Sequence, residues 1–460
     1  MNKTIFSRGL ALILLLGILL SLAACGSKAV PTNPSDPAVE TQDPGTQPES
    51  EKPTSAGKTP SPLVIGKAEA ADLMENYKAE AVPEKAADEA FRADMLRFSS
   101  ELFREVYGRE SQSKTLLVSP FSVMTALAMT ANGAQGKTLS EMEAALAGKG
   151  LTLEDLNAYL HSYLTALPSS EDASFAFANS IWFRDMEGFS VKTDFLQKNV
   201  NYYGAGVFKA PFDQTTVRDI NQWVAANTHE LIPSLLDSLD EEARMVLINA
   251  LVFEAKWADP FDSEFDVRDG IFTPLSGEPQ TVPMMYGRVW DYISGDDCTG
   301  FMKSYAGDKY RFVALLPDQN ISLDDFVRSL TAEKLSALLS DPVSIKTIIM
   351  LPKFSYDYKT SLVTALEALG IRQAFTESAQ FGGISDSPLT IGSVIHKTHI
   401  DVDNEGTKAA AVTAVIVEAT AMPGPEEIRK VYLDRPFVYL IIDSETSLPL
   451  FIGTLTEIGR

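Results

Sequence analysis

Five runs of β-branched and aromatic residues, all after residue 245, constrain the fold of this chain more than any other feature. Each run has the length and composition typical of a β-strand. The runs are Val246–Trp257, Arg311–Asp318, Lys346–Tyr358, Pro436–Ile442 and Pro449–Leu455. Helical patterns concentrate earlier in the chain. Because helices come early and strands come late, we predict an α+β fold with large antiparallel or mixed sheets, in preference to a doubly wound parallel sheet.

The helical pattern is clearest after Glu84, where apolar side chains recur at helical spacing and predict one buried helix face. These side chains are Phe91, Met95, Phe98, Leu102 and Val106. The next segment, residues 116–146, is typical of a short strand, a turn and a helix. Ser119 is a suitable N-cap, Pro120 suits the first helical position, and Gly133 suits the end of the helix.

The N-terminus has the pattern of an export signal. Lys3 and Arg8 precede an apolar run, which ends in Leu22-Ala23-Ala24-Cys25. An uncleaved membrane anchor is the alternative, but the run is short for a span of about 20 residues. The small residues before the cysteine resemble the bacterial lipoprotein signal. This resemblance implies a signal peptide over residues 1–24, lipidation of Cys25, and an extracytoplasmic protein anchored by lipid to a bacterial cell membrane.

The remaining cysteine, Cys298, then has no partner for an intrachain disulfide, and we expect a small buried apolar residue there. Residues 25–69 are rich in Pro, Ser, Thr and Gly and poor in large apolar groups. Such a segment cannot bury enough surface to fold and predicts a disordered tether. A folded body should follow over residues 70–460. The length of 460 residues would by itself suggest two or three domains.

Nothing in the sequence indicates an enzyme, a cofactor or a metal site. The formal net charge of -23 argues against a nucleic-acid partner, which needs basic patches. His229-Glu230 begins like a zinc-binding helix but lacks the second histidine. His396 and His399 lie three residues apart without a companion ligand. Ser119 and Ser122 have no histidine nearby, although a triad can be assembled from distant segments.

The chain from about Ala70 to its last residue resembles the serpin family. The blocks that carry the resemblance occur in the family's order along the body. They are LLVSPFSVMTALAMTANGAQGKT, VLINALVFEAKWADPF, TVPMM, LPKFSYDY, LEALGIRQAF, DRPFVYLII and PLFIGTL. The resemblance implies one large domain with about three β-sheets, eight or nine helices and an exposed reactive-centre loop at about 404–430. It also implies a monomer.

The segment DVDNEGTKAAAVTAV resembles the hinge of that loop. The hinge positions are Glu405, Gly406, Thr407, Ala409, Ala410, Ala411 and Thr413. In inhibitory members of the family a protease cleaves the loop and forms an acyl-enzyme. The loop then inserts into the central sheet and distorts the protease. Three positions depart from the family pattern: Asn404 stands where an acidic residue is commoner, Lys408 replaces a common Glu, and Val412 replaces a common Ala.

The side chains after Gly406 suit such an insertion. A strand presents alternate residues to each face of a sheet. If Thr407 points inward, the other inward positions are Ala409, Ala411, Thr413 and Val415, and none of them is charged. Lys408 would then point outward and keep its charge in water, whereas an inward charge carries a desolvation penalty of about several kcal/mol.

The usual loop length places the cleaved bond between Thr420 and Ala421. Met422-Pro423 is an alternative bond, although a proline after the cleaved residue usually blocks attack. No Lys or Arg occurs between Lys408 and Arg429, which disfavours trypsin-like proteases. Small side chains around the bond favour an elastase-like or subtilisin-like target.

Five positions resemble family residues that control opening of the central sheet. Ser119, Ser122 and Asn249 resemble residues that let the sheet open. Trp257 and His396 resemble residues at the end of the sheet where the loop first inserts, with ordinary core packing as the alternative for each. The resemblance implies a suicide-substrate inhibitor, with serine proteases as covalent partners. A non-inhibitory binding protein of the same fold, or a cysteine protease inhibitor, is the alternative.

Overall fold

The computed structural model describes residues 69–459 except 111–112, 149, 168–171, 241 and 408–426. The predicted signal peptide, the lipidation site Cys25 and the tether up to residue 68 lie outside these residues. So do the predicted bond Thr420–Ala421 and the hinge positions Ala409, Ala410, Ala411 and Thr413. Within the described part of the chain, no helix combines the length and the apolar character needed to cross a membrane.

The described residues form nine α-helices, and the first six precede the strands of the second half, as the sequence predicts. Their bounds are α1 (Glu89–Arg109), α2 (Pro120–Ala131), α3 (Gly136–Leu146), α4 (Leu153–Ala166), α5 (Thr193–Tyr203), α6 (Gln214–Asn227), α7 (Leu323–Ser329), α8 (Ala332–Ser340) and α9 (Val363–Ala368), with a short 3-10 helix η1 (Gln373–Phe375). All five apolar residues predicted on the face of α1 are buried. Ser119 caps α2 as predicted and accepts a hydrogen bond from the Ser122 backbone N–H.

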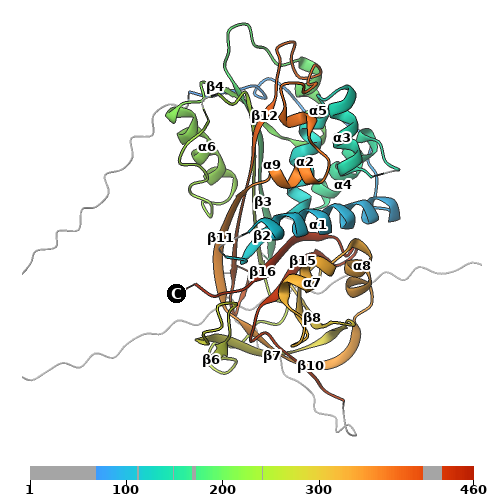
Figure 1. Ribbon diagram of the computed structural model, residues 1–460, viewed down its shortest axis with the longest axis vertical. Helices are drawn as coiled ribbons and strands as arrows, with labels where there is room; N and C mark the ends of the chain where they lie inside the picture. Colours follow the sequence, from blue (N-terminus) through green and yellow to red (C-terminus); the bar gives the residue numbers. More distant parts are fainter. Residues whose placement is uncertain are drawn as a thin grey trace, which may run out of the picture. The chain divides into compact units, whose positions relative to one another are not determined.

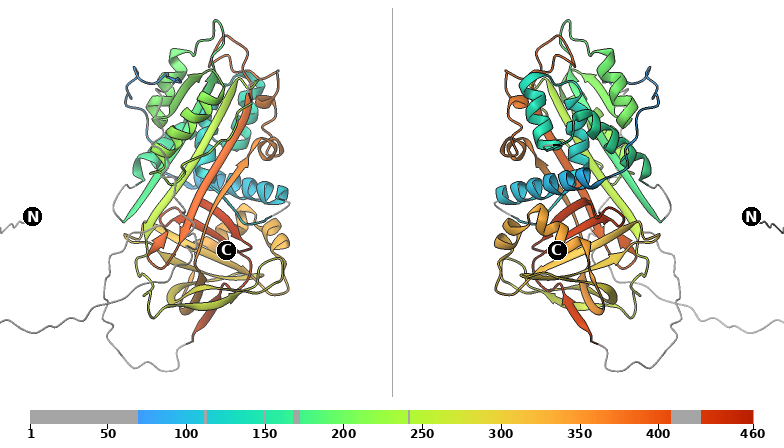
Figure 2. Two further views of the ribbon diagram at one scale, coloured as in Figure 1. Left: turned by 90° about the vertical axis from the view of Figure 1, so that its left-hand side faces the viewer. Right: turned by 90° about the vertical axis from the view of Figure 1, so that its right-hand side faces the viewer.

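A seven-stranded sheet, which we call the central sheet, contains the longest runs of parallel and of antiparallel pairing between described strands. Its strand order is β1 (Ala71–Asp72), β4 (Gly206–Ala210), β3 (Ala173–Arg184), β5 (Met245–Lys256), β13 (Gly406–Thr407), β12 (Ile391–Val402) and β11 (Phe354–Ser361). Figure 2 shows β5 in yellow-green and β12 in orange as long strands side by side.

A nine-stranded sheet forms the other layer. Its order is β14 (Arg429–Tyr432), β10 (Val343–Pro352), β7 (Gln280–Ser294), β8 (Cys298–Ser304), β9 (Tyr310–Pro317), β15 (Phe437–Asp443), β16 (Pro449–Leu455) and β2 (Leu116–Val118), with β6 (Val267–Phe272) paired to β7. The resemblance implied about three sheets, whereas the described strands pair into two; β6, β7, β10 and β14 form one part of the nine-stranded sheet. The 15-residue strand β7 joins it to the rest by continuous pairing.

One predicted strand is in fact two. The run Lys346–Tyr358 divides into β10 and β11, which belong to different sheets and are separated by Lys353. Pro352 ends the first strand, and proline has no N–H to donate to a sheet ladder. Phe354, Tyr356 and Tyr358 of β11 follow the aliphatic residues of β10 after a single lysine, so composition alone could not locate the break.

Two apolar clusters cover the two faces of the central sheet. The larger contains α1, α2 and the second sheet, and it includes Leu247, Leu251 and Phe253 of β5. The smaller lies between the opposite face and α6, and it includes Ile248 and Ala250. Figure 1 shows α6 on one side of the sheet and α2 to α5 on the other. Both faces of the sheet are therefore covered along the middle of β5.

Cys298 is buried, as predicted for a small apolar position, with 1% of its surface exposed. Burial raises the pKa of its thiol to about 12, so the thiol stays protonated and unreactive at neutral pH.

Candidate functional site in the central sheet

The candidate site is the boundary between β5 and β12. Over most of their length these strands pair directly and in parallel, from Ile391 opposite Met245 to His399 opposite Val252. At one end the two-residue strand β13 lies between them. Thr407 is paired with Ala255 of β5 and with Val402 of β12, and β13 is antiparallel to both strands. The first residues of the predicted hinge therefore already occupy one end of this boundary, and the rest of it is closed.

The hinge fits tightly where it lies between the strands. Thr407 is 1% exposed, and its hydroxyl is hydrogen-bonded to the Tyr305 hydroxyl at 2.6 Å. The Thr407 side chain thus points inward. A Cβ on Gly406 would lie 2.1 Å from the Ala255 carbonyl oxygen, so only glycine fits there. The Asp403 side chain accepts hydrogen bonds from the backbone N–H groups of Glu405 and Gly406 at 2.8 and 3.1 Å.

Trp257 lies beside the hinge, as the resemblance implies. Its backbone N–H donates to the Glu405 carbonyl at 2.8 Å, and its indole N–H donates to the Asp403 carbonyl at 2.9 Å. The indole stacks on the ring of Tyr305, with centroids 4.5 Å apart and planes at 8°. Tyr305 was not predicted from the sequence, because nothing around it distinguishes it from other aromatic core residues.

His396 does not lie at the end of the sheet where the hinge enters, and this part of the prediction is wrong. His396 is paired with Asn249 near the middle of β5, whereas Trp257 directly follows the end of that strand. Along β12, His396 is six residues from Val402, which pairs with the hinge. At 3.3 Å per residue that separation is about 20 Å. The sequence could not reveal it, because the register between distant strands was not known.

His396 instead joins the three other predicted sheet-opening residues in one buried polar cluster. Ser119, Ser122 and Asn249 are each 0% exposed, as is His396. Two of them come from the beginning of α2 and two from adjacent strands. Asn179 of β3, opposite Asn249, completes the cluster. We call these five residues the polar cluster. Asn179 is a polar residue within the apolar run of β3, and that signal in the sequence could have identified it.

The hydrogen bonds of the polar cluster fix its protonation. The Ser119 backbone N–H donates to His396 Nε2 at 3.1 Å, so Nε2 is the unprotonated nitrogen. Nδ1 therefore carries the proton and donates to the Asn249 side-chain oxygen. The Asn249 amide donates to Ser122 Oγ at 2.5 Å and to Asn179 Oδ1 at 2.6 Å. Complete burial lowers the pKa of His396 to about 3.

The bond between Asn249 and His396 connects β5 directly to β12. This side-chain hydrogen bond adds to the backbone pairing of β5 with β12. It must break if a strand is to enter between the two strands. Because buried polar groups are costly when unpaired, the incoming strand must offer a replacement partner.

Because His396 is buried and neutral, we predict that the free energy of unfolding decreases as the pH falls. In the unfolded chain His396 takes a proton near its ordinary pKa of 6.5, but in the folded chain it stays neutral down to about 3. The unfolded state therefore binds more protons between these values, and stability falls as the pH falls. We expect His396 to account for a loss of about 3 kcal/mol in the free energy of unfolding between about pH 7 and pH 4.5.

Urea denaturation across that pH range measures the effect. The His396→Gln variant is the matched control, because it keeps a hydrogen-bonding side chain that does not titrate. It should start less stable and show a shallower pH dependence. Equal slopes for the two proteins would contradict the assignment of a neutral histidine.

The described residues contain no cluster that suits a metal. His399 points to the opposite face of β12 from His396 and contacts Asp357 at 2.7 Å, so the two histidines cannot share an ion. No group of three or more His, Cys, Asp or Glu among the described residues is arranged to hold one. His229 follows the end of α6, exposed, and contacts Glu254 at 3.0 Å.

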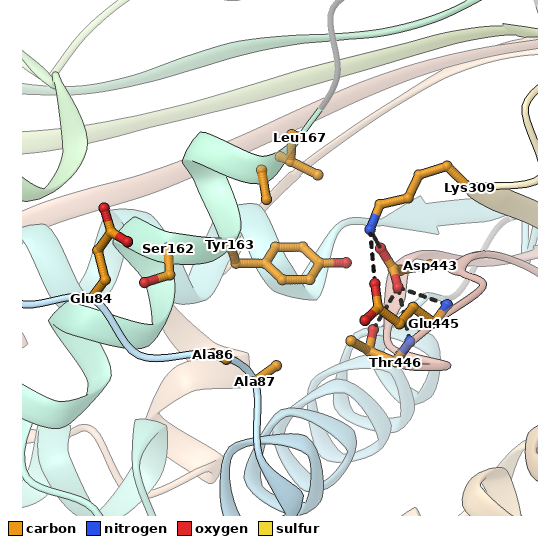
Figure 3. Close-up of a pocket in the computed structure, with 11 residues that line it drawn as sticks. Glu84, Ala86, Ala87, Ser162, Tyr163, Leu167, Lys309, Asp443, Glu445 and Thr446 are labelled. Carbon is orange, nitrogen blue, oxygen red and sulfur yellow. Dashed lines mark hydrogen bonds and ion pairs between the residues drawn. The ribbon is translucent and has the colours of Figure 1, made fainter. Parts of the chain in front are cut away.

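A pocket between α4 and the turn joining β15 to β16 is separate from the boundary of β5 and β12 (Figure 3). Its buried acid, Asp443, accepts hydrogen bonds from the backbone N–H groups of Glu445 and Thr446 at 3.0 and 2.9 Å. Lys309 forms an ion pair with the same carboxylate at 2.9 Å. These contacts hold the turn in place, so we assign Asp443 a structural role.

Comparisons with known proteins agree with this geometry. Residues 93–458 match the family described as Serpin (serine protease inhibitor). Leukocyte elastase inhibitor from Bos taurus is 31% identical over 80% of this chain and 100% of its own length. Iripin-2 from Ixodes ricinus is 30% identical over 79% of this chain and 92% of its own. The native crystal structure of tengpin, a thermophilic serpin, is 42% identical with a TM-score of 0.80, and covers 85% of this chain and 100% of tengpin.

Proposed function

The chain belongs to the serpin family, and on that premise we propose that it is a suicide-substrate inhibitor of serine proteases. The observation that carries the proposal is the position of β13, because the beginning of the hinge already lies between β5 and β12. We further propose that the protein is a monomer, held outside a bacterial cell by a lipid on Cys25. The same reading makes it an inhibitor and not an enzyme, in keeping with its relatives.

The register of β13 determines where each later residue would go. Continued residue by residue, it places residues 408–415 opposite β5 from Glu254 back to Leu247 and opposite β12 from Asp401 back to Val394. One parallel ladder is thereby replaced by two antiparallel ladders, and antiparallel pairing is the more stable per residue. The exchange adds roughly one backbone hydrogen bond per inserted residue, each contributing about 0.5–1.5 kcal/mol.

This register brings Thr413 into the row of Asn249 and His396. Insertion breaks the hydrogen bond between those two side chains. The Thr413 hydroxyl can both donate and accept, so it can replace the lost partner of either residue. Among residues 408–415, the inward row then carries a polar side chain only at Thr413, where it would meet the polar cluster.

The outward-pointing side chains of the inserted strand would not all lie in water. Lys408 would lie between Glu254 and Asp401, at the partly exposed end of the strands, where its charge is matched. Farther along, the outward face of β5 is covered by α6, and Ile248 and Ala250 are buried there. Ala410, Val412 and Ala414 would therefore face α6 and not water. Their small size suits that covered face as well.

We propose Thr420–Ala421 as the cleaved bond and an elastase-like or subtilisin-like enzyme as the target. Small side chains around the bond suit the narrow or permissive pockets of those enzymes. One relative is named as a leukocyte elastase inhibitor, which supports the same class.

Incubation with elastase and with subtilisin tests the proposal. An inhibitor should give a covalent complex that survives boiling in SDS, and mass spectrometry of the released peptide should begin at Ala421. A protease whose catalytic serine is replaced by alanine is the control and should give no such complex. Cleaved protein and fully active protease across a broad panel would support a non-inhibitory member of the family. Complexes with cysteine proteases alone would support the other alternative.

A further inference from the structure

One lysine lies in the interior, next to the hinge. Lys303, near the end of β8, is 5% exposed, and no other lysine or arginine of the described residues is buried. Its ammonium donates a hydrogen bond to the Asp259 backbone carbonyl at 2.6 Å. A lysine is rarely buried in a protein interior, and this one has a neutral acceptor. Its position therefore calls for an explanation.

Two aromatic rings complete the surroundings of the ammonium. Lys303 Nζ lies 4.6 Å from the centroid of the Phe261 ring and 5.5 Å from that of the Trp257 ring. An ammonium within about 6 Å of such a ring is attracted by its π electrons. Lys303 thus contacts the segment 257–261, which follows β5, at three of its five residues.

The same segment holds the turn that leads into the hinge. The Trp257 backbone N–H donates to the Glu405 carbonyl at 2.8 Å, and the Phe261 backbone N–H donates to the Asn404 carbonyl at 2.9 Å. The indole N–H of Trp257 donates to the Asp403 carbonyl at 2.9 Å. Three consecutive carbonyls before Gly406 are therefore bound by the segment that Lys303 contacts.

Tyr305 follows Lys303 by two residues and contacts the hinge itself. Its hydroxyl is hydrogen-bonded to the Thr407 hydroxyl at 2.6 Å, and its ring stacks on Trp257. Burial raises the pKa of Tyr305 well above its ordinary range, so the hydroxyl stays neutral. We call four residues the hinge seat, namely Trp257, Phe261, Lys303 and Tyr305.

Burial makes the charge of Lys303 costly while the hinge seat is closed. It lowers the pKa of Lys303 from 10.5 to about 8, and Asp259 and Asp266 offset this shift only in part. If the segment 257–261 moves away from β8, water reaches the ammonium and its pKa returns towards 10.5. The open form then binds protons more strongly than the closed form, so opening becomes less favourable as the pH rises. With these two pKa values, the opening equilibrium constant should fall about tenfold between about pH 7 and pH 9.

Other side chains around the hinge seat do not share this behaviour. Asp403 accepts hydrogen bonds from the backbone of its own turn. Lys353 donates a hydrogen bond to the Asn404 side-chain oxygen. Phe312 of β9, which is paired with Lys303, is uncharged. We therefore assign the pH dependence of the hinge seat to Lys303.

We propose that Lys303 and Tyr305 are positioning residues for inhibition. They hold Thr407 between β5 and β12 before the loop is cleaved, and this hold tightens as the pH rises from neutral. Insertion then starts from a residue that is already in register, so a tighter hold leaves the protease less time to escape. This inference rests on the proposed inhibitory function and names two residues that set its efficiency and its pH dependence.

Hydrogen exchange followed by mass spectrometry tests the hold without a protease. The peptides to follow contain residues 257–261 and 403–407, and each rate is corrected for the intrinsic effect of pH. In the wild-type protein their protection should rise about tenfold between about pH 7 and pH 9. Lys303→Met keeps an unbranched side chain and removes the charge. It should be about tenfold or more better protected at neutral pH and should show no such rise. Equal pH profiles for the two proteins would overturn the inference.

The two positioning residues should change inhibition in opposite directions. Tyr305→Phe keeps the ring that stacks on Trp257 and removes the hydroxyl that binds the hinge. The number of inhibitor molecules consumed per trapped protease should therefore rise about threefold or more at neutral pH. Adding Lys303→Met to Tyr305→Phe should restore at least about half of the lost efficiency, because it tightens the rest of the hinge seat. A further loss of efficiency in the double variant would contradict the proposal.

Lys334→Met is the matched control. The Lys334 ammonium lies 4.7 Å from the centroid of the Phe326 ring and pairs with Asp297 at 2.6 Å. Asp297 directly precedes β8, whereas Lys303 is near the other end of that strand. The control variant should leave the exchange of both peptides and the consumption of inhibitor unchanged. An effect equal to that of Lys303→Met would mean that the loss of any lysine packed on a ring suffices, and would refute the hinge seat.

The exchange experiment also separates this inference from the proposed function. If exchange follows the prediction while no protease is trapped, the hinge seat stands and the inhibitory proposal fails. If proteases are trapped while wild-type protein and Lys303→Met exchange alike at every pH, the hinge seat is refuted and the inhibitory function stands.

Discussion

The Thr413→Arg variant should be a substrate of its target protease instead of an inhibitor. Continued into the proposed inserted strand, the register of β13 would place residue 413 between Asn249 and His396, which are both fully buried. An arginine there would bring an unpaired charge against the polar cluster, at a cost of about several kcal/mol. Since about 1.4 kcal/mol in a barrier changes a rate tenfold, insertion should become much slower than deacylation.

Titration of a fixed amount of protease with each variant measures the outcome. The number of inhibitor molecules consumed per trapped protease should rise more than tenfold, and the SDS-stable complex should almost disappear. Thr413→Val is the matched control, because it keeps the β-branched shape and adds no charge. We expect it to remain an inhibitor, somewhat weakened by the missing hydroxyl. Efficient inhibition by Thr413→Arg would mean that residue 413 does not point inward.

Cleavage within the loop should raise the thermal unfolding midpoint by on the order of 10 °C or more. The eight inserted residues add about one backbone hydrogen bond each, and their inward side chains become buried. Stabilisation on that scale shifts the midpoint by at least several degrees in a domain of this size. Differential scanning calorimetry before and after limited proteolysis with a non-target protease measures the shift.

The same comparison has an internal control in Thr413→Arg. Its uncleaved form should melt close to the uncleaved wild type, because the substitution lies outside the part of the sheet that is already occupied. Its cleaved form should gain far less than the cleaved wild type. Identical melting of intact and cleaved wild-type protein would point to the non-inhibitory alternative.

Local patterns in the sequence predicted the elements well. The apolar spacing of α1 and the Ser119-Pro120 start of α2 are both confirmed, because each depends on residues within a few positions of one another. The strand Pro449–Leu455 has the predicted bounds. The division of Lys346–Tyr358 into β10 and β11 was missed, since aliphatic residues of β10 are followed after one lysine by aromatic residues of β11 and only Pro352 marks the change of sheet.

The candidate site was harder to predict, because it is assembled from distant segments. Ser122, Asn249 and His396 were each selected by resemblance, but their common cluster depends on the register of β5 against β12. That register is set by packing on both faces of the sheet and leaves no local signal. For the same reason the resemblance misplaced His396 at the end of the sheet where the hinge enters, and the sequence gave no indication of Tyr305.

The hydrogen bonds of the polar cluster and of the hinge explain how β5 and β12 can be paired directly and yet could separate to admit a strand. The Thr407–Tyr305 hydrogen bond holds the first hinge residue in the sheet. The Asn249–His396 hydrogen bond closes the sheet farther along. Between these two points the strands are joined mainly by a parallel ladder, which the proposed insertion would replace with a more stable arrangement.

A crystal structure of the loop-cleaved protein would test the account most directly. We predict that residues 408–415 form a new strand antiparallel to both β5 and β12, with Thr413 next to Asn249 and His396 and Lys408 next to Glu254. Direct parallel pairing of β5 with β12 retained after cleavage, with the loop remaining outside the sheet, would contradict it.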